Sequence, residues 1–234
     1  MKFQNHHPAI AGPAATASGS EQRAAAISQA HQEIDAATKA FAEQTGIACP
    51  EGCGRCCHSP EVEATVADVL PLAMEIVRRG EAEATLMRLA ERADDLRCAL
   101  FQPDAEDGNR GRCTMYAWRP SICRLFGFAG RRDADGQPQY SACRVHSQVM
   151  PEVVAAAKQA VAERRVALPI LSDLAGRVAA AAPDGLSRPL PINVALRRAI
   201  NAAALQAWLE AAQGHDDDHD GSTPSPNVPP RQAA

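Results

Sequence analysis

The sequence predicts a mainly α-helical protein whose helices pack around an irregular, cysteine-rich metal-binding centre. Three observations predict this class: alanine-rich stretches with helical periodicity flank the middle of the chain, the middle itself is irregular, and all eight cysteines fall within residues 49–143. Aromatic residues make up only 4% of the 234 residues. A core built from Ala, Val and Leu buries modest area per residue, so bound metal would add needed stability.

The first expected helix covers residues 21–44. Apolar side chains recur there at three- and four-residue intervals, among them Ile27, Ile34 and Phe41, which is the pattern of an amphipathic helix. Gly46 is the expected terminator. The preceding residues 1–20 are polar, contain Pro and Gly, and predict disorder.

Two further helices are expected after the cysteine loop. Residues 65–80 begin with Thr65 as a candidate N-cap and Asp68 three residues later, which resembles a capping box. Residues 81–98 carry leucines on one side and end at Cys98. Both helices are therefore expected to border the cysteine-rich middle.

The middle of the chain shows little regular pattern. Residues 99–112 are rich in turn formers and are expected to be exposed, and residues 113–146 hold most of the aromatic side chains. The stretch "DADGQ" at 133–137 predicts the turn of one short hairpin.

Helical periodicity returns after the middle, at residues 147–167, 170–182 and 192–213. The tail 214–234 is acidic and then Pro-rich, and predicts disorder. The chain is thus expected to hold one domain over residues 21–213.

Charge and hydropathy exclude some functions and set an expected compartment. The net charge is −4 and there is no long basic block, so nucleic-acid binding is not indicated. No stretch approaches the roughly 18 apolar residues of a membrane span, and the N-terminus lacks the apolar run of a signal peptide. We therefore expect a cytoplasmic protein without a membrane partner, in which clustered thiols bind metal rather than form disulfides.

The cysteines fall into two sets along the chain. The first set, within "CPEGCGRCCH", is Cys49, Cys53, Cys56 and Cys57; the second set is Cys98, Cys113, Cys123 and Cys143. Thiolates at this density repel one another unless a cation neutralises them, and a metal ion also contributes folding energy. All eight are therefore candidate metal ligands, enough for two four-ligand zinc sites or for iron–sulfur ligation, and the two sets are expected to meet in space.

The local chemistry of the first set raises two expectations. Cys53 and Cys56 have the spacing of a metal knuckle, with Gly54 expected to take a positive φ in the tight turn. The neighbours Cys56 and Cys57 would point in opposite directions if the backbone were extended, so both could not easily reach one ion.

The combined motifs resemble a known family. "CPEGCGRCCH", a later "RC" and then "CTMYAWRPSICRLFGF" are similar to the bacterial cysteine-cluster family with a CxxCxxCC signature, the YkgJ-type proteins, described as a zinc- or iron-chelating domain. The resemblance covers roughly residues 45–147. It departs from the family pattern in the first gap, which has three residues rather than two, and in a lengthened loop at 102–112.

The resemblance implies chelation of zinc or iron, with a [4Fe–4S] or [2Fe–2S] cluster as an alternative occupant. It carries onto this chain the clustered Cys53, Cys56 and Cys57, the two outlying cysteines of the second set, and a "C-x-x-Y…R-P-x-x-C-R" element. The residues of that element are Cys113, Tyr116, Arg119, Pro120, Cys123 and Arg124. Flagellin lysine N-methylases resemble the same family, so an Fe–S-dependent protein-modifying enzyme is the second hypothesis. A radical SAM enzyme is disfavoured because a helix, not a strand, precedes the motif and no βα units follow it.

Several other side chains are candidates for supporting roles. His58 and His146 each lie close to a cysteine, and His58 is favoured if one of them is a ligand. Arg119 and Arg124 are expected either to stabilise thiolates or to pair with nearby carboxylates. The aromatic side chains near the second set are expected to form a small core that shields the metal, and they are Tyr116, Trp118, Phe126 and Phe128.

Overall fold

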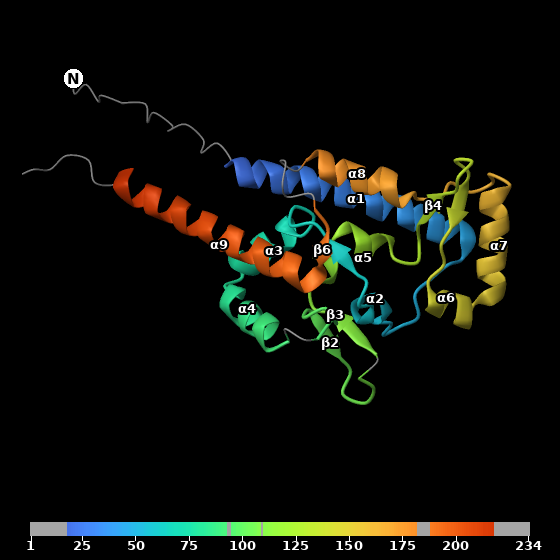
Figure 1. Cartoon of the computed structure of the whole chain (residues 1–234), viewed down its shortest axis with the longest axis horizontal. Helices are drawn as coiled ribbons and strands as arrows, with labels where there is room; N and C mark the ends of the chain where they lie inside the picture. The colour runs from blue at the N-terminus through green and yellow to red at the C-terminus, as the bar shows by residue number, and fades with distance from the viewer. Residues whose placement is uncertain (1–17, 93–94, 109, 182–187, 218–234) are drawn as a thin grey trace, which may run out of the picture.

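The computed structural model describes residues 18–92, 95–108, 110–181 and 188–217 (Figure 1). The chain is mainly α-helical, as predicted, with only short antiparallel strand pairs. Disorder was expected at residues 1–20 and 214–234; residues 1–17 and 218–234 lie outside the described residues, whereas 19–20 and 214–217 are helical, so the prediction was wrong there. The helices are α1 (Gly19–Thr45), α2 (Arg55–His58), α3 (Leu70–Arg78), α4 (Ala82–Glu91), η1 (Tyr116–Trp118, 3-10), α5 (Ser121–Leu125), α6 (Arg144–Val149), α7 (Pro151–Ala162), α8 (Leu171–Ala180) and α9 (Ile192–Asp217).

Helix α1 is fixed at both ends by local sequence. The Ser18 side chain accepts from the backbone N–H of Glu21, and the Glu21 carboxylate accepts from the Ser18 N–H at 2.8 Å, which is a complete capping box. The helix therefore begins at Gly19, two residues before the expected boundary. Gly46 ends it in the left-handed conformation at φ 75°, and Ile34 on the predicted face is fully buried.

Helix α3 is shorter than the sequence predicted. The Thr65 hydroxyl does accept from the Asp68 N–H at 3.0 Å, but this bond closes a turn, and the helix begins only at Leu70. Pro71 occupies the first turn, where its missing N–H costs no hydrogen bond. Helix α4 likewise ends at Glu91 rather than at Cys98.

The C-terminal helices follow the predicted pattern with one break. The stretch 147–167 was expected to be one helix, but it divides into α6 and α7 at Met150, which has φ −144° and ψ 56°. Met150 precedes Pro151, and the residue before a proline is disfavoured in the α conformation. Helix α9 continues four residues beyond the expected end, to Asp217.

Three antiparallel strand pairs occur in the described chain, where one hairpin was predicted. Strands β4 (Gly130–Arg132) and β5 (Pro138–Tyr140) form that hairpin. Strands β2 (Phe101–Pro103) and β3 (Gly111–Cys113) pair within a region predicted to be irregular. Strands β1 (Glu63–Ala64) and β6 (Leu190–Pro191) are far apart in sequence, and their pairing leaves no local signal.

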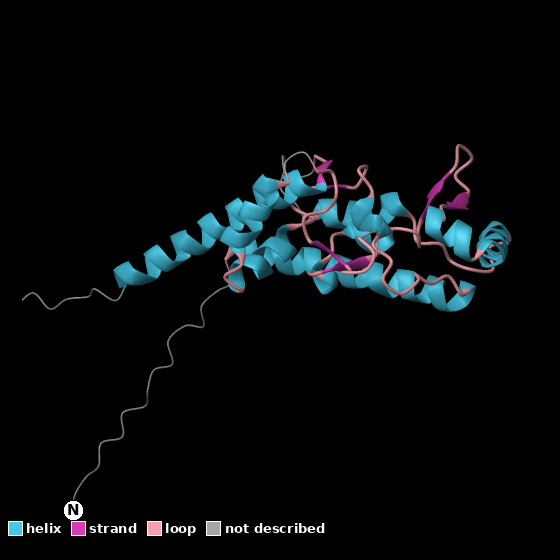
Figure 2. Ribbon diagram, turned by 90° about the horizontal axis from the view of Figure 1, so that it is seen from below, coloured by secondary structure: helices cyan, strands magenta, loops and turns pink. Residues whose placement is uncertain are grey.

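The helices pack in a long arrangement that encloses the middle of the chain. Helix α3 packs against α9, and α1 packs against α5, α8 and α7. Figure 1 shows α8 alongside α1, with α2 and α5 between this pair and the β2–β3 hairpin, and Figure 2 shows the C-terminal part of α9 extending away from the body. No helix within the described ranges has the length and apolarity needed to cross a bilayer.

A buried carboxylate ties three of these segments together. Asp68 accepts from His31 Nε2 of α1 at 2.7 Å and from the backbone N–H and the hydroxyl of Ser121 at 3.0 Å and 2.8 Å. All three residues are buried. Because Asp68 lies between the other two, the arrangement is a structural node at the start of α5 and not a nucleophilic triad, in which histidine would be central.

Candidate metal centre

Two cysteines of the first set lie on a single helical turn. Cys56 and Cys57 belong to α2, so the premise of an extended backbone was wrong, and the two side chains do not point in opposite directions. The expectation for Gly54 was also wrong, since its φ is −95° and the positive φ of 67° belongs to Gly52. Gly54 is required for space instead: a Cβ there would lie 2.3 Å from the Phe101 ring.

Backbone pairing brings the second set to this turn. The Cys98 N–H donates to the Cys57 carbonyl at 2.9 Å, which fixes the chain that follows α4 against α2. Strand β3 then places Cys113 opposite Phe101, and α5 supplies Cys123. The two sets therefore do meet in space, although sequence reasoning did not predict the hairpin that joins them.

Five thiols surround one small enclosed space, which we call the thiol cavity. They are Cys56, Cys57, Cys98, Cys113 and Cys123. Its volume is about 20 Å³, and the rest of its wall is mostly aliphatic, including Val69 and Leu72 of the main core. A cavity of roughly 10–15 Å³ on this measure holds one water molecule, so the space suits about one ion.

The thiols of the cavity share protons unequally. Cys57 has one S–H, which can donate to Cys56 or to Cys113, and its contact with each of them, aided by the charge of Arg119, lowers the pKa of both to about 7. The same contacts raise the pKa of Cys57. Burial raises the pKa of Cys98 to about 12.

Without a cation, the cavity thus favours thiolates at two positions and thiols at the others. A bound ion would also deprotonate those of the remaining thiols that coordinate it, because a coordinating thiol is deprotonated outright.

The two arginines of the motif have different surroundings. Arg119 is the one whose charge acts on the thiols, and its guanidinium lies 3.5 Å from the centre of the Tyr116 ring. Arg124 is buried; it pairs with Asp35 and donates to the Ala117 carbonyl at 2.7 Å. Arg119 is thus placed to favour thiolate, and Arg124 is structural.

The predicted aromatic shield is only partly present. Tyr116 is 62% exposed and covers nothing, because its ring stacks under Arg119 on the surface. Trp118 and Phe126 are partly buried against the main core, and Phe128 packs elsewhere, against the cluster at the end of α1. The wall of the thiol cavity is aliphatic instead.

Three predicted ligands lie outside the thiol cavity. Cys49 and Cys143 are close to His146, whose Nε2 is 3.5 Å from Cys49 Sγ and whose backbone N–H donates to Cys143 Sγ at 3.3 Å. Cys53 is bridged to Arg110 through the backbone. His58, the histidine favoured from sequence, packs its ring edge-on against Phe101. The sequence feature that could have indicated His146 as a neighbour of the cysteines is its position three residues after Cys143.

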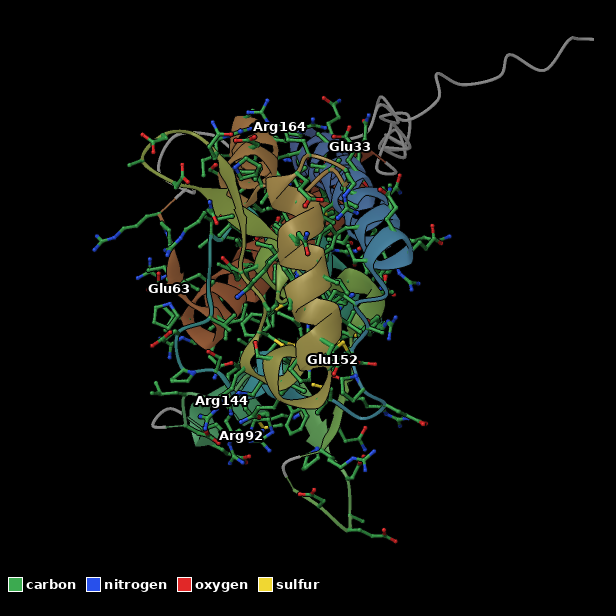
Figure 3. All side chains as sticks on the ribbon, turned by 90° about the vertical axis from the view of Figure 1, so that its right-hand side faces the viewer. Glu33, Glu63, Arg92, Arg144, Glu152 and Arg164 are labelled. Atoms are coloured by element: carbon green, nitrogen blue, oxygen red, sulfur yellow. The ribbon has the colours of Figure 1, made fainter. Side chains whose placement is uncertain are left out.

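A larger open hollow of about 580 Å³ connects these regions, and we call it the cationic hollow. All the cysteines except Cys98 line it. Its lining contains one acidic residue, Asp35, and five basic residues, which are Lys39, Arg55, Arg112, Arg119 and Arg124. Figure 3 draws the side chains on the ribbon, and the charged residues Arg144 and Glu152, which it labels, are exposed.

The donor set fits a thiophilic ion in composition and volume. Within the described residues, no group of three or more His, Cys, Asp or Glu side chains is already arranged to hold one ion. The thiols of the cavity nevertheless interact with one another around a space of ionic size. Rotation between staggered rotamers about Cα–Cβ is sufficient to redirect a cysteine sulfur.

Comparison with known families agrees with this chemistry. Residues 48–162 match the CxxCxxCC family, described as "putative zinc- or iron-chelating domain". The CxxCxxCC region includes all eight cysteines and ends with α7, and the description supports metal binding by the chain. It does not address the narrower YkgJ-type grouping. Comparison with curated proteins and with solved structures finds no match.

Proposed function

We propose that this protein binds one zinc or iron ion in the thiol cavity, with ligands drawn from its five cysteines. The observation that carries the proposal is the enclosed volume of about 20 Å³ bordered by all five thiols. Four thiolates complete a tetrahedral zinc site, so the fifth is either a spare or a hydrogen-bonding neighbour.

A single ion suits this volume better than an iron–sulfur cluster. A [4Fe–4S] or [2Fe–2S] group contains several atoms besides its thiolate ligands, whereas the cavity has room for about one. We therefore rank a mononuclear zinc or iron centre first. An iron–sulfur cluster would require the cavity to widen toward the cationic hollow.

The Fe–S-dependent modifying enzyme, of the kind represented by flagellin lysine N-methylases, is the second candidate. The cationic hollow favours it, since a ligand-sized volume adjoins the thiols. A cytoplasmic setting suits either candidate, because its reducing conditions keep thiols available to metal.

Elemental analysis of anaerobically purified variants tests the proposal. Cys98→Ser and Cys113→Ser change two of the five thiols, and since only one thiol can be spare, at least one of these variants should lose the bound ion. Val69→Ala is the matched control: it borders the same cavity and is fully buried, so it should lower stability while keeping the metal.

Colour separates the two candidates in the same preparation. A colourless protein with zinc supports the first, whereas a brown protein absorbing near 400 nm supports an iron–sulfur cluster. Unchanged metal content in both cysteine variants would refute the proposal for the thiol cavity.

A further inference from the structure

We propose that Cys49, Cys143 and His146 form a second metal site, separate from the thiol cavity, with two thiolates and one imidazole as its protein ligands. The three residues come from the loop after α1 and from the start of α6. Cys49 and His146 are 97 positions apart in the chain, and the fold brings their side chains together.

The separation between Cys49 and His146 is that of two ligands on one ion. A tetrahedral zinc ion has bonds of about 2.3 Å to sulfur and about 2.0–2.1 Å to nitrogen. Two such ligands at the tetrahedral angle lie about 3.5 Å apart. The distance from Cys49 Sγ to His146 Nε2 is 3.5 Å. A neutral hydrogen bond between these groups would satisfy the same distance, so the surroundings of the imidazole decide between the two.

The imidazole of His146 has few conventional partners. Its exposed fraction is 0%, and its Nδ1 is buried without a hydrogen-bond partner among the described residues. Its Nε2 faces only the sulfur of Cys49. Buried histidines normally have both nitrogens satisfied. A metal on Nε2 would satisfy that nitrogen, and Nδ1 would then need a water molecule as its acceptor. His58 Nε2 is unpaired in the same way among the described residues, so the case for His146 depends on the neighbouring sulfur.

The backbone around His146 is shaped to hold the ring. Gly127 has φ 83°, and a Cβ there would lie 2.9 Å from the His146 ring and 3.3 Å from Cys143 Cβ. Phe128 contacts the same ring edge-on, with centroids 5.4 Å apart. The ring is therefore fixed next to Cys143, in the way that a metal ligand must be oriented by its surroundings.

Cys143 is the third proposed ligand, and because the three side chains are not already arranged around one point, its sulfur has to turn to another staggered rotamer to complete the set. Its sulfur already faces the start of α6, where it accepts from the His146 backbone N–H at 3.3 Å.

The second site is distinct from the thiol cavity. Neither Cys49 nor Cys143 borders that cavity, although both line the cationic hollow. The two sites share no ligand, so a substitution in one is expected to leave the ligands of the other in place.

Three protein ligands have a chemical consequence. A set of two thiolates and one imidazole suits zinc, and three protein ligands leave a fourth position for water or another molecule. Cys49 is exposed, so that position is open to the cationic hollow. The basic lining of the hollow would favour an anionic fourth ligand.

Zinc and cobalt titration of metal-depleted protein tests the second site. The wild-type chain should bind two equivalents of Zn²⁺, and Cys49→Ser, Cys143→Ser and His146→Gln should each bind one. His58→Gln is the matched control, because His58 also follows a cysteine closely but packs on Phe101, and it should bind two. Co²⁺ bound to the wild type should show an absorption component that His146→Gln removes.

A site-resolved measurement covers variants that fold poorly. In the wild type, Zn²⁺ should protect Cys49 and Cys143 from alkylation. The extent of alkylation is measured by mass spectrometry of the peptides that contain these two cysteines. In His146→Gln the protection of these two cysteines should be lost while that of Cys98 stays. Circular dichroism confirms that the helices are intact.

The outcomes separate this inference from the proposed function. Two equivalents in His146→Gln and Cys49→Ser, or alkylation of Cys49 unaffected by Zn²⁺, would overturn the second site. A Cys49–Cys143 disulfide in protein purified without oxidant would overturn it as well. Loss of one equivalent in Cys49→Ser but none in either Cys98→Ser or Cys113→Ser would support the second site and refute the thiol cavity instead.

Discussion

Replacing Asp68 with alanine removes one carboxylate that joins α1, the turn before α3 and the start of α5. The His31 imidazole and the Ser121 backbone N–H would both lose their acceptor. Both residues are only 3% exposed, so water cannot substitute without opening the fold. Since α5 carries Cys123, the change would also loosen one wall of the thiol cavity.

The expected cost follows from these two unpaired groups. Each buried donor left without an acceptor costs about 1–3 kcal/mol, so the two groups together cost about 2–6 kcal/mol. We expect Asp68→Ala to lower the free energy of unfolding by about 2–6 kcal/mol. At about 2–4 °C per kcal/mol for a domain of this size, the midpoint of thermal unfolding should fall by about 4–24 °C.

Urea unfolding followed by far-UV circular dichroism measures this change. Zinc should be held at one saturating concentration, because a ligand of the native state shifts apparent stability. Asp173→Ala is the control: Asp173 pairs with Arg132 at 2.9 Å, but its side chain is 52% exposed. That variant should change stability by less than about 1 kcal/mol. A loss below about 1 kcal/mol for Asp68→Ala would refute the reasoning.

Three further outcomes follow from the same structure. Gly54→Ala should cost about 1–3 kcal/mol in urea unfolding, because its Cβ would meet the buried Phe101 ring at 2.3 Å, whereas Gly176→Ala, with open space around it, should not destabilise. The pKa of Glu75 is lowered to about 2, chiefly by hydrogen bonds from two arginines. Its contribution to stability should therefore be complete above its ordinary pKa of 4.5 and disappear as the pH falls through about 2, so Glu75→Gln should unfold with a weaker pH dependence in that window. Chelation under reducing conditions should raise the number of titratable thiols while most of the circular dichroism of α1 and α9 remains, and thiols that appear only after reductant is added would instead indicate disulfides.

Part of the fold could be predicted from the sequence because its causes are local. The apolar periodicity of α1 and the stop at Gly46 lie within one segment of chain, and the capping box at Ser18 was present in the sequence although our boundary overlooked it. The division at Met150 also has a local cause in Pro151. The hairpin at 133–137 was predicted because its turn residues are adjacent.

For the site, the sequence by itself determined which residue type carries the chemistry. Eight cysteines in one region, with the motif of the CxxCxxCC family, were sufficient to predict metal binding. The tertiary structure decided how the cysteines are grouped, and this grouping differs from the two sets defined along the chain. Cys49 was expected with Cys56, but lies beside His146. His146 was ranked below His58, but it is the one beside a cysteine sulfur.

The physical reason is that ligand grouping depends on contacts between distant segments. Cys98 reaches Cys57 through a backbone hydrogen bond that spans 41 positions of the chain, and Cys113 follows through the pairing of β2 with β3. Those strands have three residues each, too few for a periodic signal. Sequence periodicity specifies an element from its own residues, whereas the distance between two sulfurs is set by how the elements pack, and only the folded chain determines that.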